Sequence, residues 1–262
     1  MDLKDLLPQW NIDSLQKNLQ KEFDKLLYKK FTHKLLESLY EYTEPTIEGI
    51  ENIPKHGPTL VIPNHSGILA LDALVLQYII MKQAKRFPYT MSHNFWHSQP
   101  FFKYSSEKMG YIPQDFKAAI KLLKENKLLV LFPEAEEGNF KPSIYMYRLQ
   151  SFNPGFISLA LLTNATIVPT CIIGAEEANI NLGYIYLEKS NVKVPIPLNL
   201  IPFPVKWKII FLRPISLNKY NKSNAKDIEF LQEAAQIIRM KIQHRIHIEL
   251  LNRGILKYLV DG

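Results

Sequence analysis

Short apolar runs alternate with segments of helical periodicity throughout the chain after residue 45. The apolar runs are TLVIP, PYTMS, KLLVLFP, TIVPTCIIG and KWKIIFLRPI. Between them, and after the last, lie ALDALVLQYIIMKQA, FKAAIKLLKEN, GFISLALLTN and a mixed-charge helical pattern over residues 225–252. Alternation of this kind is typical of strands that take turns with helices. We therefore predict an α/β fold with a largely parallel central sheet flanked by helices.

The first part of the chain has a different pattern. From Asp13 to Thr43 there is no proline or glycine, and leucines and Phe23 recur at helical spacing beside six lysines. Such a helix can pack on the domain with its lysines in water. It can instead lie in a membrane interface with its lysines against anionic head groups, and both interpretations stay open. We divide the chain into an N-terminal amphipathic helical extension, residues 1–44, and one α/β domain, residues 45–262.

A proline-rich apolar stretch, VPIPLNLIPFPVKW, covers residues 194–207 and contains four prolines. Proline at this density excludes a membrane-spanning helix and a central strand. The pattern therefore predicts an apolar loop, either folded over the core or exposed as a lip that contacts a membrane.

Composition narrows the class of partner. The net charge of +7 suits an anionic partner, but the lysines are dispersed, so nucleic acid is the least favoured choice. The N-terminal sequence MDLKDLLPQW does not resemble a signal peptide, and no apolar run reaches the ~20 residues of a spanning helix. We expect a cytoplasmic protein, peripheral on the inner face of a membrane. Cys171, the single cysteine, is interpreted as a core thiol.

Polar residues gather where the predicted strands end. Asn64 and His65 follow TLVIP, Pro133 and Glu134 follow LLVLF, and the sequence GAEE follows TCII. Open α/β sheets bind their ligands beyond the carboxyl ends of the strands. These three strand ends are therefore the expected position of a site.

His65 and Asp72 are the first candidate pair, with six residues between them. In a continuous helix they would share a face but lie ~10.5 Å apart along the axis. A direct hydrogen bond needs the chain to fold back at Ser66-Gly67-Ile68 before the helix begins. If it does, the carboxylate can orient the imidazole, whose ordinary pKa of ~6.5 suits proton transfer.

A second group of charged residues lies in FPEAEEGNFKPSIYMYRL. Glu134, Glu136 and Glu137 precede Gly138, Lys141 and Arg148. The simplest interpretation is a solvated loop. The alternative is a binding segment, in which Lys141 and Arg148 receive a phosphate and Glu134 fixes a loop or a hydroxyl. No His/Cys spacing supports a metal site.

Four blocks of this sequence resemble those of a known family. NHSG with its downstream aspartate, GYIPQD, FPEAEEG and IVPTCIIGAEEA occur in the order and at roughly the spacing found in glycerolipid acyltransferases. The chain looks most like the monoacylglycerol acyltransferase-like branch of the lysophospholipid acyltransferase superfamily, from about Ile50 to Pro214.

The resemblance implies transfer of a fatty acyl chain from acyl-CoA or acyl carrier protein to a hydroxyl of a glycerolipid or lysophospholipid acceptor. On this basis His65 is the general base, Asp72 orients it, and no cofactor is needed beyond the acyl donor. The block around Glu134 corresponds to the acceptor-binding segment, and Val168-Pro169 to the fourth block. The candidate acceptor-binding residues are Glu134, Gly138, Lys141 and Arg148.

The chain departs from the family pattern at three points. The usual His–Asp block has four intervening residues, where this chain has six, as in the named branch. The usual FPEG glycine is replaced by Ala135, which we expect to remove positive-φ freedom. Gln114, Asp115 and Phe116 occupy the region where many relatives carry a phosphate-binding arginine. This weakens an assignment to lysophosphatidic acid and leaves neutral or other lysolipid acceptors open, unless Lys117, Lys141 or Arg148 compensates.

Two other functions remain as alternatives. Ser66 next to His65 suggests a lipid hydrolase, but adjacent residues do not readily form a Ser–His pair and GxSxG is absent. The altered second block and Ala135 are compatible with a catalytically silent lipid-binding or membrane protein of the same fold.

Overall fold

The computed structural model describes residues 33–66, 70–93, 109–187 and 192–253. Seven strands in this part of the chain form one sheet in the order β1-β9-β6-β2-β5-β3-β4. Neighbouring strands are parallel except for β6 and β9. The strands are β1 (Thr46–Glu48), β2 (Thr59–Pro63), β3 (Pro88–Ser92), β4 (Tyr111–Pro113), β5 (Leu128–Val130), β6 (Thr166–Ile173) and β9 (Lys208–Phe211). The predicted α/β fold with a largely parallel sheet is confirmed.

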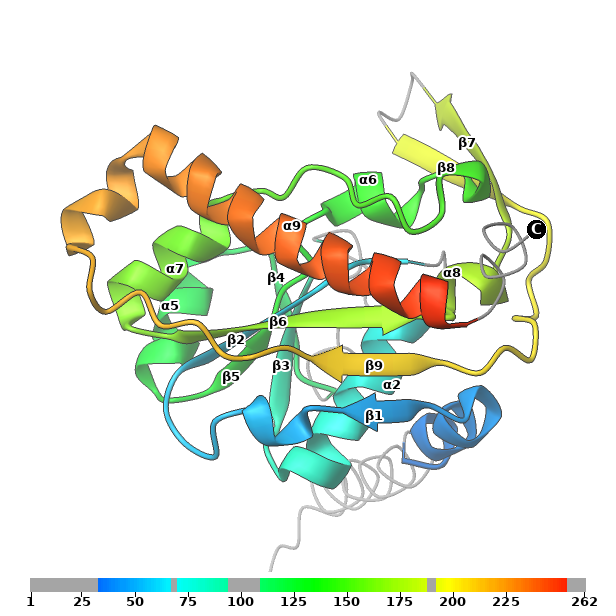
Figure 1. Ribbon diagram of the computed structural model, residues 1–262, viewed down its shortest axis with the longest axis horizontal. Coiled ribbons are helices and arrows are strands. Elements are labelled where there is room, and N and C mark those ends of the chain that lie inside the picture. The colour runs from blue at the N-terminus through cyan, green and yellow to red at the C-terminus, as the bar shows by residue number, and fades with distance from the viewer. Residues whose placement is uncertain (1–32, 67–69, 94–108, 188–191, 254–262) are drawn as a thin grey trace, which may run out of the picture.

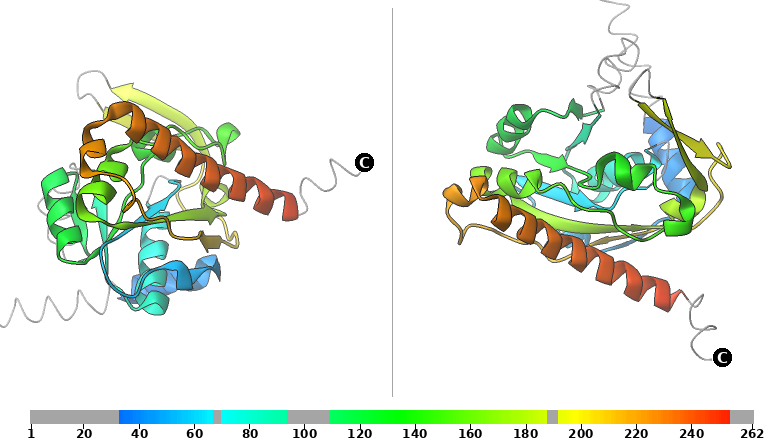
Figure 2. Two further views of the ribbon diagram at one scale, coloured as in Figure 1. Left: turned by 60° about the vertical axis from the view of Figure 1, so that its left-hand side comes forward. Right: turned by 90° about the horizontal axis from the view of Figure 1, so that it is seen from above.

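Helices cover both faces of this sheet (Figures 1 and 2). On one face α5 (Phe116–Lys124), α7 (Gly155–Thr163) and α9 (Ile228–Asn252) share a buried apolar cluster with the strands. On the other face α2 (Leu71–Ile79) continues into the π-helical turn η3 (Ile80–Ala84) and packs with Val61 and Trp207. Burial of these strands on both faces explains their nearly continuous apolar sequences.

The remaining short elements connect or edge these layers. They are η2 (Ile50–Asn52), α6 (Ala135–Asn139), η4 (Ser143–Tyr145), α8 (Ala175–Ala178) and η6 (Lys222–Lys226). Cys171 is fully buried in β6, in agreement with its interpretation as a core thiol.

The N-terminal extension is described only over residues 33–43, which are helical; its residues 13–32, with most of the predicted leucine stripe, lie outside the described part. The described turns pack against α2, where the rings of Tyr40 and Tyr78 lie 5.3 Å apart. The ammonium of Lys82 lies 4.7 Å from the centre of the Tyr40 ring. This segment therefore packs on the domain, as the first of the two interpretations expects.

The proline-rich stretch is only partly a loop. Residues Val192–Pro197 form β8, which pairs antiparallel with β7 (Asn181–Leu187) in a separate two-stranded sheet, so the prediction of a loop is wrong there. Proline is tolerated because an edge strand does not need every N–H in a ladder. Residues 198–206 then follow without regular structure, and Leu200 and Ile201 are 71% and 81% exposed. In the part of the chain described, no helix is long and apolar enough to span a membrane.

Candidate active site

The three strand ends singled out in the sequence lie side by side. β2 runs between β5 and β6, parallel to both, so the residues that follow these strands emerge at one edge. Asn64 secures the end of β2: its side-chain amide donates to the Ile172 carbonyl at 2.9 Å and accepts from the Ile172 N–H at 2.7 Å. This pair of hydrogen bonds sets the direction in which the chain leaves β2, and hence the position of His65.

His65 and Asp72 are hydrogen-bonded. The Nδ1 atom of His65 lies 2.7 Å from Oδ2 of Asp72, whose side chain is fully buried. The same Oδ2 accepts the Ser66 N–H at 2.8 Å, and Oδ1 accepts the Ala73 N–H at 2.8 Å. Because both carboxylate oxygens are held by the backbone, Asp72 has a fixed orientation toward the imidazole.

The fold-back required by the six-residue spacing is present. Helix α2 begins only at Leu71, after Ala70 in a left-handed conformation with φ 52°, so Asp72 lies in the first turn. Gly67 and Ile68, expected to make the turn, lie outside the described residues. A carboxylate in the first turn of a helix also benefits from the helix dipole.

The surroundings of His65 favour its protonated form. Burial lowers the pKa of His65, but the Asp72 carboxylate, with a smaller contribution from Glu134, outweighs it and leaves the pKa above 6.5. The imidazole also packs against the Phe132 ring, with centroids 4.3 Å apart. An acceptor carboxylate on Nδ1 leaves Nε2 as the nitrogen that can take a proton from a substrate.

Glu134 is buried and supports the backbone of the site. Its Oε1 accepts the His65 N–H at 3.0 Å, and its Oε2 accepts the Gln150 N–H at 2.6 Å. Burial raises the pKa of Glu134, while the nearby Lys141 partly opposes this. Of the two roles considered for Glu134, the structure shows that of fixing a loop, since both oxygens already have backbone partners.

Gly138 and Lys141 lie beside this carboxylate. A Cβ at Gly138 would come within 2.6 Å of the Glu134 Cβ, so the close approach of α6 to Glu134 needs glycine. Lys141 is almost fully buried and donates to the Arg148 carbonyl at 3.0 Å and to Oε1 of Glu176 at 3.1 Å. The predicted cation is therefore present, with a carboxylate partner that sequence reasoning did not identify.

Arg148, Glu136 and Glu137 are exposed. The Arg148 guanidinium lies 5.9 Å from the centre of the Tyr145 ring, and only the main-chain carbonyl of Arg148 reaches Lys141. The charged segment is thus divided: Glu134, Gly138 and Lys141 are buried, and the other three residues fit the solvated-loop interpretation.

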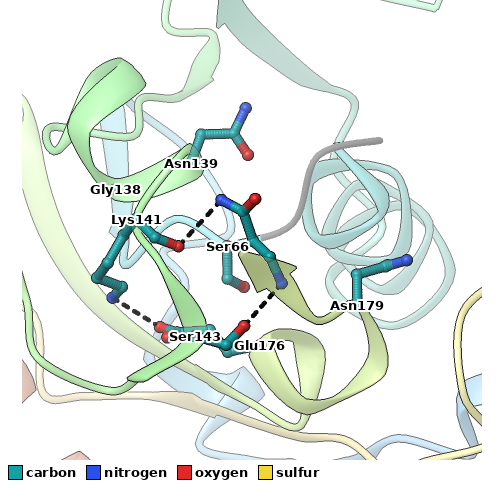
Figure 3. Close-up of a pocket in the computed structure, with 8 residues that line it drawn as sticks. Ser66, Gly138, Asn139, Lys141, Ser143, Glu176 and Asn179 are labelled. Atoms are coloured by element: carbon teal, nitrogen blue, oxygen red, sulfur yellow. Dashed lines mark hydrogen bonds and ion pairs between the residues drawn. The ribbon is translucent and has the colours of Figure 1, made fainter. Parts of the chain in front are cut away.

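A small polar pocket lies next to His65 in the chain (Figure 3). It is lined by Ser66, Gly138, Asn139, Lys141, Ser143, Glu176, Asn179 and Asn181. Glu176 could have been suspected from GAEE at the end of β6, but its contact with Lys141 joins positions 35 residues apart. The Ser66 hydroxyl has no hydrogen-bond partner within the described structure, so no Ser66–His65 pair supports the hydrolase alternative.

Ala135 adopts the conformation for which the family uses glycine. Its φ is 50°, in the left-handed region, so the expectation that alanine would remove this conformation is wrong. The backbone contacts of Glu134 and of the following α6 hold Ala135 there, at a cost of roughly 1–2 kcal/mol.

Comparison with known proteins agrees with this geometry. Residues 44–173 match the family model described as Acyltransferase. This part of the chain belongs to the acyltransferase family. His65, Asp72, Glu134 and Lys141 lie inside the acyltransferase-family segment, while Glu176 lies just beyond it.

Several individual relatives extend the comparison. An uncharacterized protein of Mycobacterium bovis is 32% identical over 221 residues, which are 79% of this chain and 62% of that protein. A chloroplastic 1-acyl-sn-glycerol-3-phosphate acyltransferase of Arabidopsis thaliana is 24% identical, over 61% of this chain and 44% of its own length. The chain therefore spans less than two thirds of these relatives.

A solved structure shares the fold. The crystal structure of PlsC, the 1-acyl-sn-glycerophosphate acyltransferase of Thermotoga maritima, superposes with a TM-score of 0.58 at 17% identity. It covers 87% of this chain and 81% of its own. At this identity the likeness concerns the fold of the acyltransferase domain.

We predict that Ala135→Gly stabilises the protein by roughly 0.5–1 kcal/mol, because glycine adopts positive φ without the steric cost of a Cβ. Ala135 is exposed, so its methyl group loses little packing. Urea unfolding measures the change. As a control, Ala160→Gly inside α7 should destabilise by about 1 kcal/mol or more. A loss of stability in Ala135→Gly would contradict the strain.

Proposed function

We propose that the protein transfers a fatty acyl chain from a thioester donor, acyl-CoA or acyl carrier protein, to a hydroxyl of a glycerolipid or lysophospholipid acceptor. The observation that carries the proposal is the 2.7 Å contact between His65 and the buried Asp72, in a chain whose residues 44–173 match the acyltransferase family. In this proposal His65 is the general base and Asp72 the residue that orients it.

The chemistry needs one proton acceptor and one donor, and His65 supplies both. Nε2 of His65 takes the proton of the acceptor hydroxyl, while Nδ1–H donates to Asp72. The hydroxyl oxygen attacks the thioester carbonyl, the new C–O bond forms, and the C–S bond breaks as the tetrahedral intermediate collapses. The imidazolium returns its proton to the departing thiolate.

The glycerolipid class of acceptor is supported by the relatives. The Arabidopsis and Thermotoga proteins are both named as acyltransferases that act on 1-acylglycerol phosphate. Assignment to the monoacylglycerol acyltransferase-like branch stays a prediction, which rests on the long His–Asp spacing and the altered second block. A silent lipid-binding protein stays the alternative, although Ala135, one of its two motivations, takes the glycine-like conformation.

We predict that His65→Ala lowers acyl transfer by on the order of 10²–10⁴-fold, because a positioned base contributes about this much. Thiol release from acyl-CoA and product formation by mass spectrometry, with a panel of lysolipids and monoacylglycerols, measure the loss. The matched control is His56→Ala, an exposed histidine outside the site. Unchanged activity in His65→Ala would remove the proposed base, and a wild-type protein inactive with every acceptor would favour the silent alternative.

An apolar surface next to the site supports association with a membrane. The exposed large apolar side chains of β7, β8 and the segment after them are Leu182, Tyr184, Ile185, Tyr186, Val194, Ile196, Leu198, Leu200, Ile201 and Phe203. We call this set the apolar lip. Monomeric soluble proteins rarely expose so many neighbouring apolar side chains without a partner. The net charge of +7 makes an anionic membrane the proposed partner.

We predict that replacing Leu200 and Ile201 together by serine weakens binding to liposomes at least about fivefold, since each loses burial in the lipid. Co-sedimentation with vesicles that contain 30% anionic lipid measures it. The control Ile228→Ser removes an equally exposed apolar side chain, 70% exposed, on α9. Equal binding of the double variant and wild type would remove the lip from the interface; equally weak wild-type binding to neutral and anionic vesicles would contradict the electrostatic part.

A further inference from the structure

The pocket beside His65 contains polar atoms that lack partners. Ser66 is 2% exposed, and its Oγ has no hydrogen-bond partner in the described part of the molecule. Oδ1 of Asn139, which also lines the pocket, is buried and unpartnered in the same way. In Figure 3 the Ser66 side chain lies near the middle of the lining residues. Buried polar atoms without partners are costly, which indicates that a ligand with its own donors and acceptors completes them.

The charge in the pocket is balanced. Lys141 is paired with Glu176 at 3.1 Å, and Glu134 is the other carboxylate that acts on Lys141. A site for a phosphate monoester needs an uncompensated cation, usually arginine, and here two carboxylates surround one buried ammonium. Burial raises the pKa of Glu176 to about 7, with Lys141 opposing the rise, so the carboxyl is ionised in mildly alkaline solution.

Lys141 still has a donor to offer. An ammonium has three N–H groups, and two are used by the Arg148 carbonyl and Glu176. Together with the Ser66 hydroxyl and the Asn139 carbonyl oxygen, the pocket presents one donor, one acceptor, and one group that is both. This set matches hydroxyl groups, each of which donates and accepts.

We infer that this pocket binds the uncharged hydroxyl-bearing head group of the acyl acceptor, such as the diol of a monoacylglycerol, and that Glu176 discriminates against a phosphorylated head group. The inference rests on the proposed function and adds the class of acceptor. Ser66 and Asn139 bind the head group's hydroxyls, and Glu176 acts by neutralising Lys141.

Size and position agree with a head-group site. The pocket encloses about 280 Å³, below the ~300–1,000 Å³ of pockets that take a whole drug-sized ligand. Asn181, the first residue of β7, forms part of its wall and donates to the carbonyls of Phe140 and Lys141 at 2.8 and 3.1 Å. The apolar lip begins on the same strand, so the acyl chain of an acceptor can stay on the apolar surface while its head enters the pocket.

Two acceptors with the same acyl chain test the inference: 1-oleoylglycerol and its 3-phosphate, with oleoyl-CoA at pH 8.5, where Glu176 is ionised. We expect the wild-type kcat/KM to favour the uncharged acceptor at least about tenfold. Glu176→Gln, which keeps the shape but removes the charge, should shift this ratio toward the phosphorylated acceptor by about tenfold or more. Wild-type preference for the phosphorylated acceptor, or an unchanged ratio in Glu176→Gln, overturns the inference while leaving acyl transfer itself in place.

Ser66→Ala separates ligand binding from a structural role. Because the hydroxyl has no partner to lose, the melting temperature should not fall, while KM for 1-oleoylglycerol should rise about fivefold or more. Ser158→Ala is the matched control: the buried Ser158 hydroxyl donates to the Ala225 carbonyl at 3.1 Å, so its loss should lower the melting temperature by about 2–4 °C without changing the acceptor ratio. A lower melting temperature in Ser66→Ala with unchanged KM overturns the role of Ser66.

Direct binding keeps the test independent of turnover. Calorimetric titration with 1-O-hexadecylglycerol, its 3-phosphate and free glycerol should show tightest binding of the uncharged lipid, weakened in Ser66→Ala. Tighter binding of the phosphate overturns the inference even if no acceptor is acylated, a result that would separately remove the proposed function. Equal binding of free glycerol would show that a soluble polyol, and not a lipid head group, occupies the pocket.

Discussion

The buried Asp72 carboxylate is the group on which the geometry of the site depends. It is fully buried and has three hydrogen-bond partners: the His65 ring, the Ser66 N–H and the Ala73 N–H. A buried carboxylate is tolerated only when its oxygens are hydrogen-bonded, and here the partners come from both the strand end and the helix start. The same interactions that satisfy Asp72 therefore bring β2 and α2 together and orient the imidazole.

A second buried carboxylate, Glu134, joins the other side of the site to His65. Its hydrogen bonds to the His65 and Gln150 N–H groups connect the end of β5 to the end of β2. Lys141 lies between Glu134 and Glu176, so three neighbouring strands each contribute one carboxylate or imidazole to a connected group. Removal of one member of such a group leaves a buried partner unsatisfied, which is more costly than the loss of a surface ion pair.

The sequence predicted the fold and the catalytic pair because their signals are local. Alternating apolar runs specify a parallel sheet, and strand ends mark the site, so His65, Asp72 and Glu134 could be named in advance. The partner of Lys141 could not, because Glu176 is 35 residues away and no local pattern encodes that contact. Pro195 and Pro197 concealed β8, since proline normally excludes a strand, and only the pairing with β7 shows that this strand lies in a separate two-stranded sheet. Ala135 reached positive φ because its buried neighbours impose a conformation that its own propensity disfavours.

The central claim is that His65 is the base and that Asp72 sets its pKa. The pH dependence of kcat/KM in wild type and Asp72→Asn tests it most directly, because the free imidazole must be neutral to accept a proton. Since Asp72 holds the pKa of His65 above 6.5 against the effect of burial, wild-type kcat/KM should rise with pH through a value above 6.5. In Asp72→Asn only burial and the weaker Glu134 contribution remain, so the rise should move to lower pH while the plateau falls by roughly 10²–10⁴-fold. A rise at the same pH in both proteins would contradict the account.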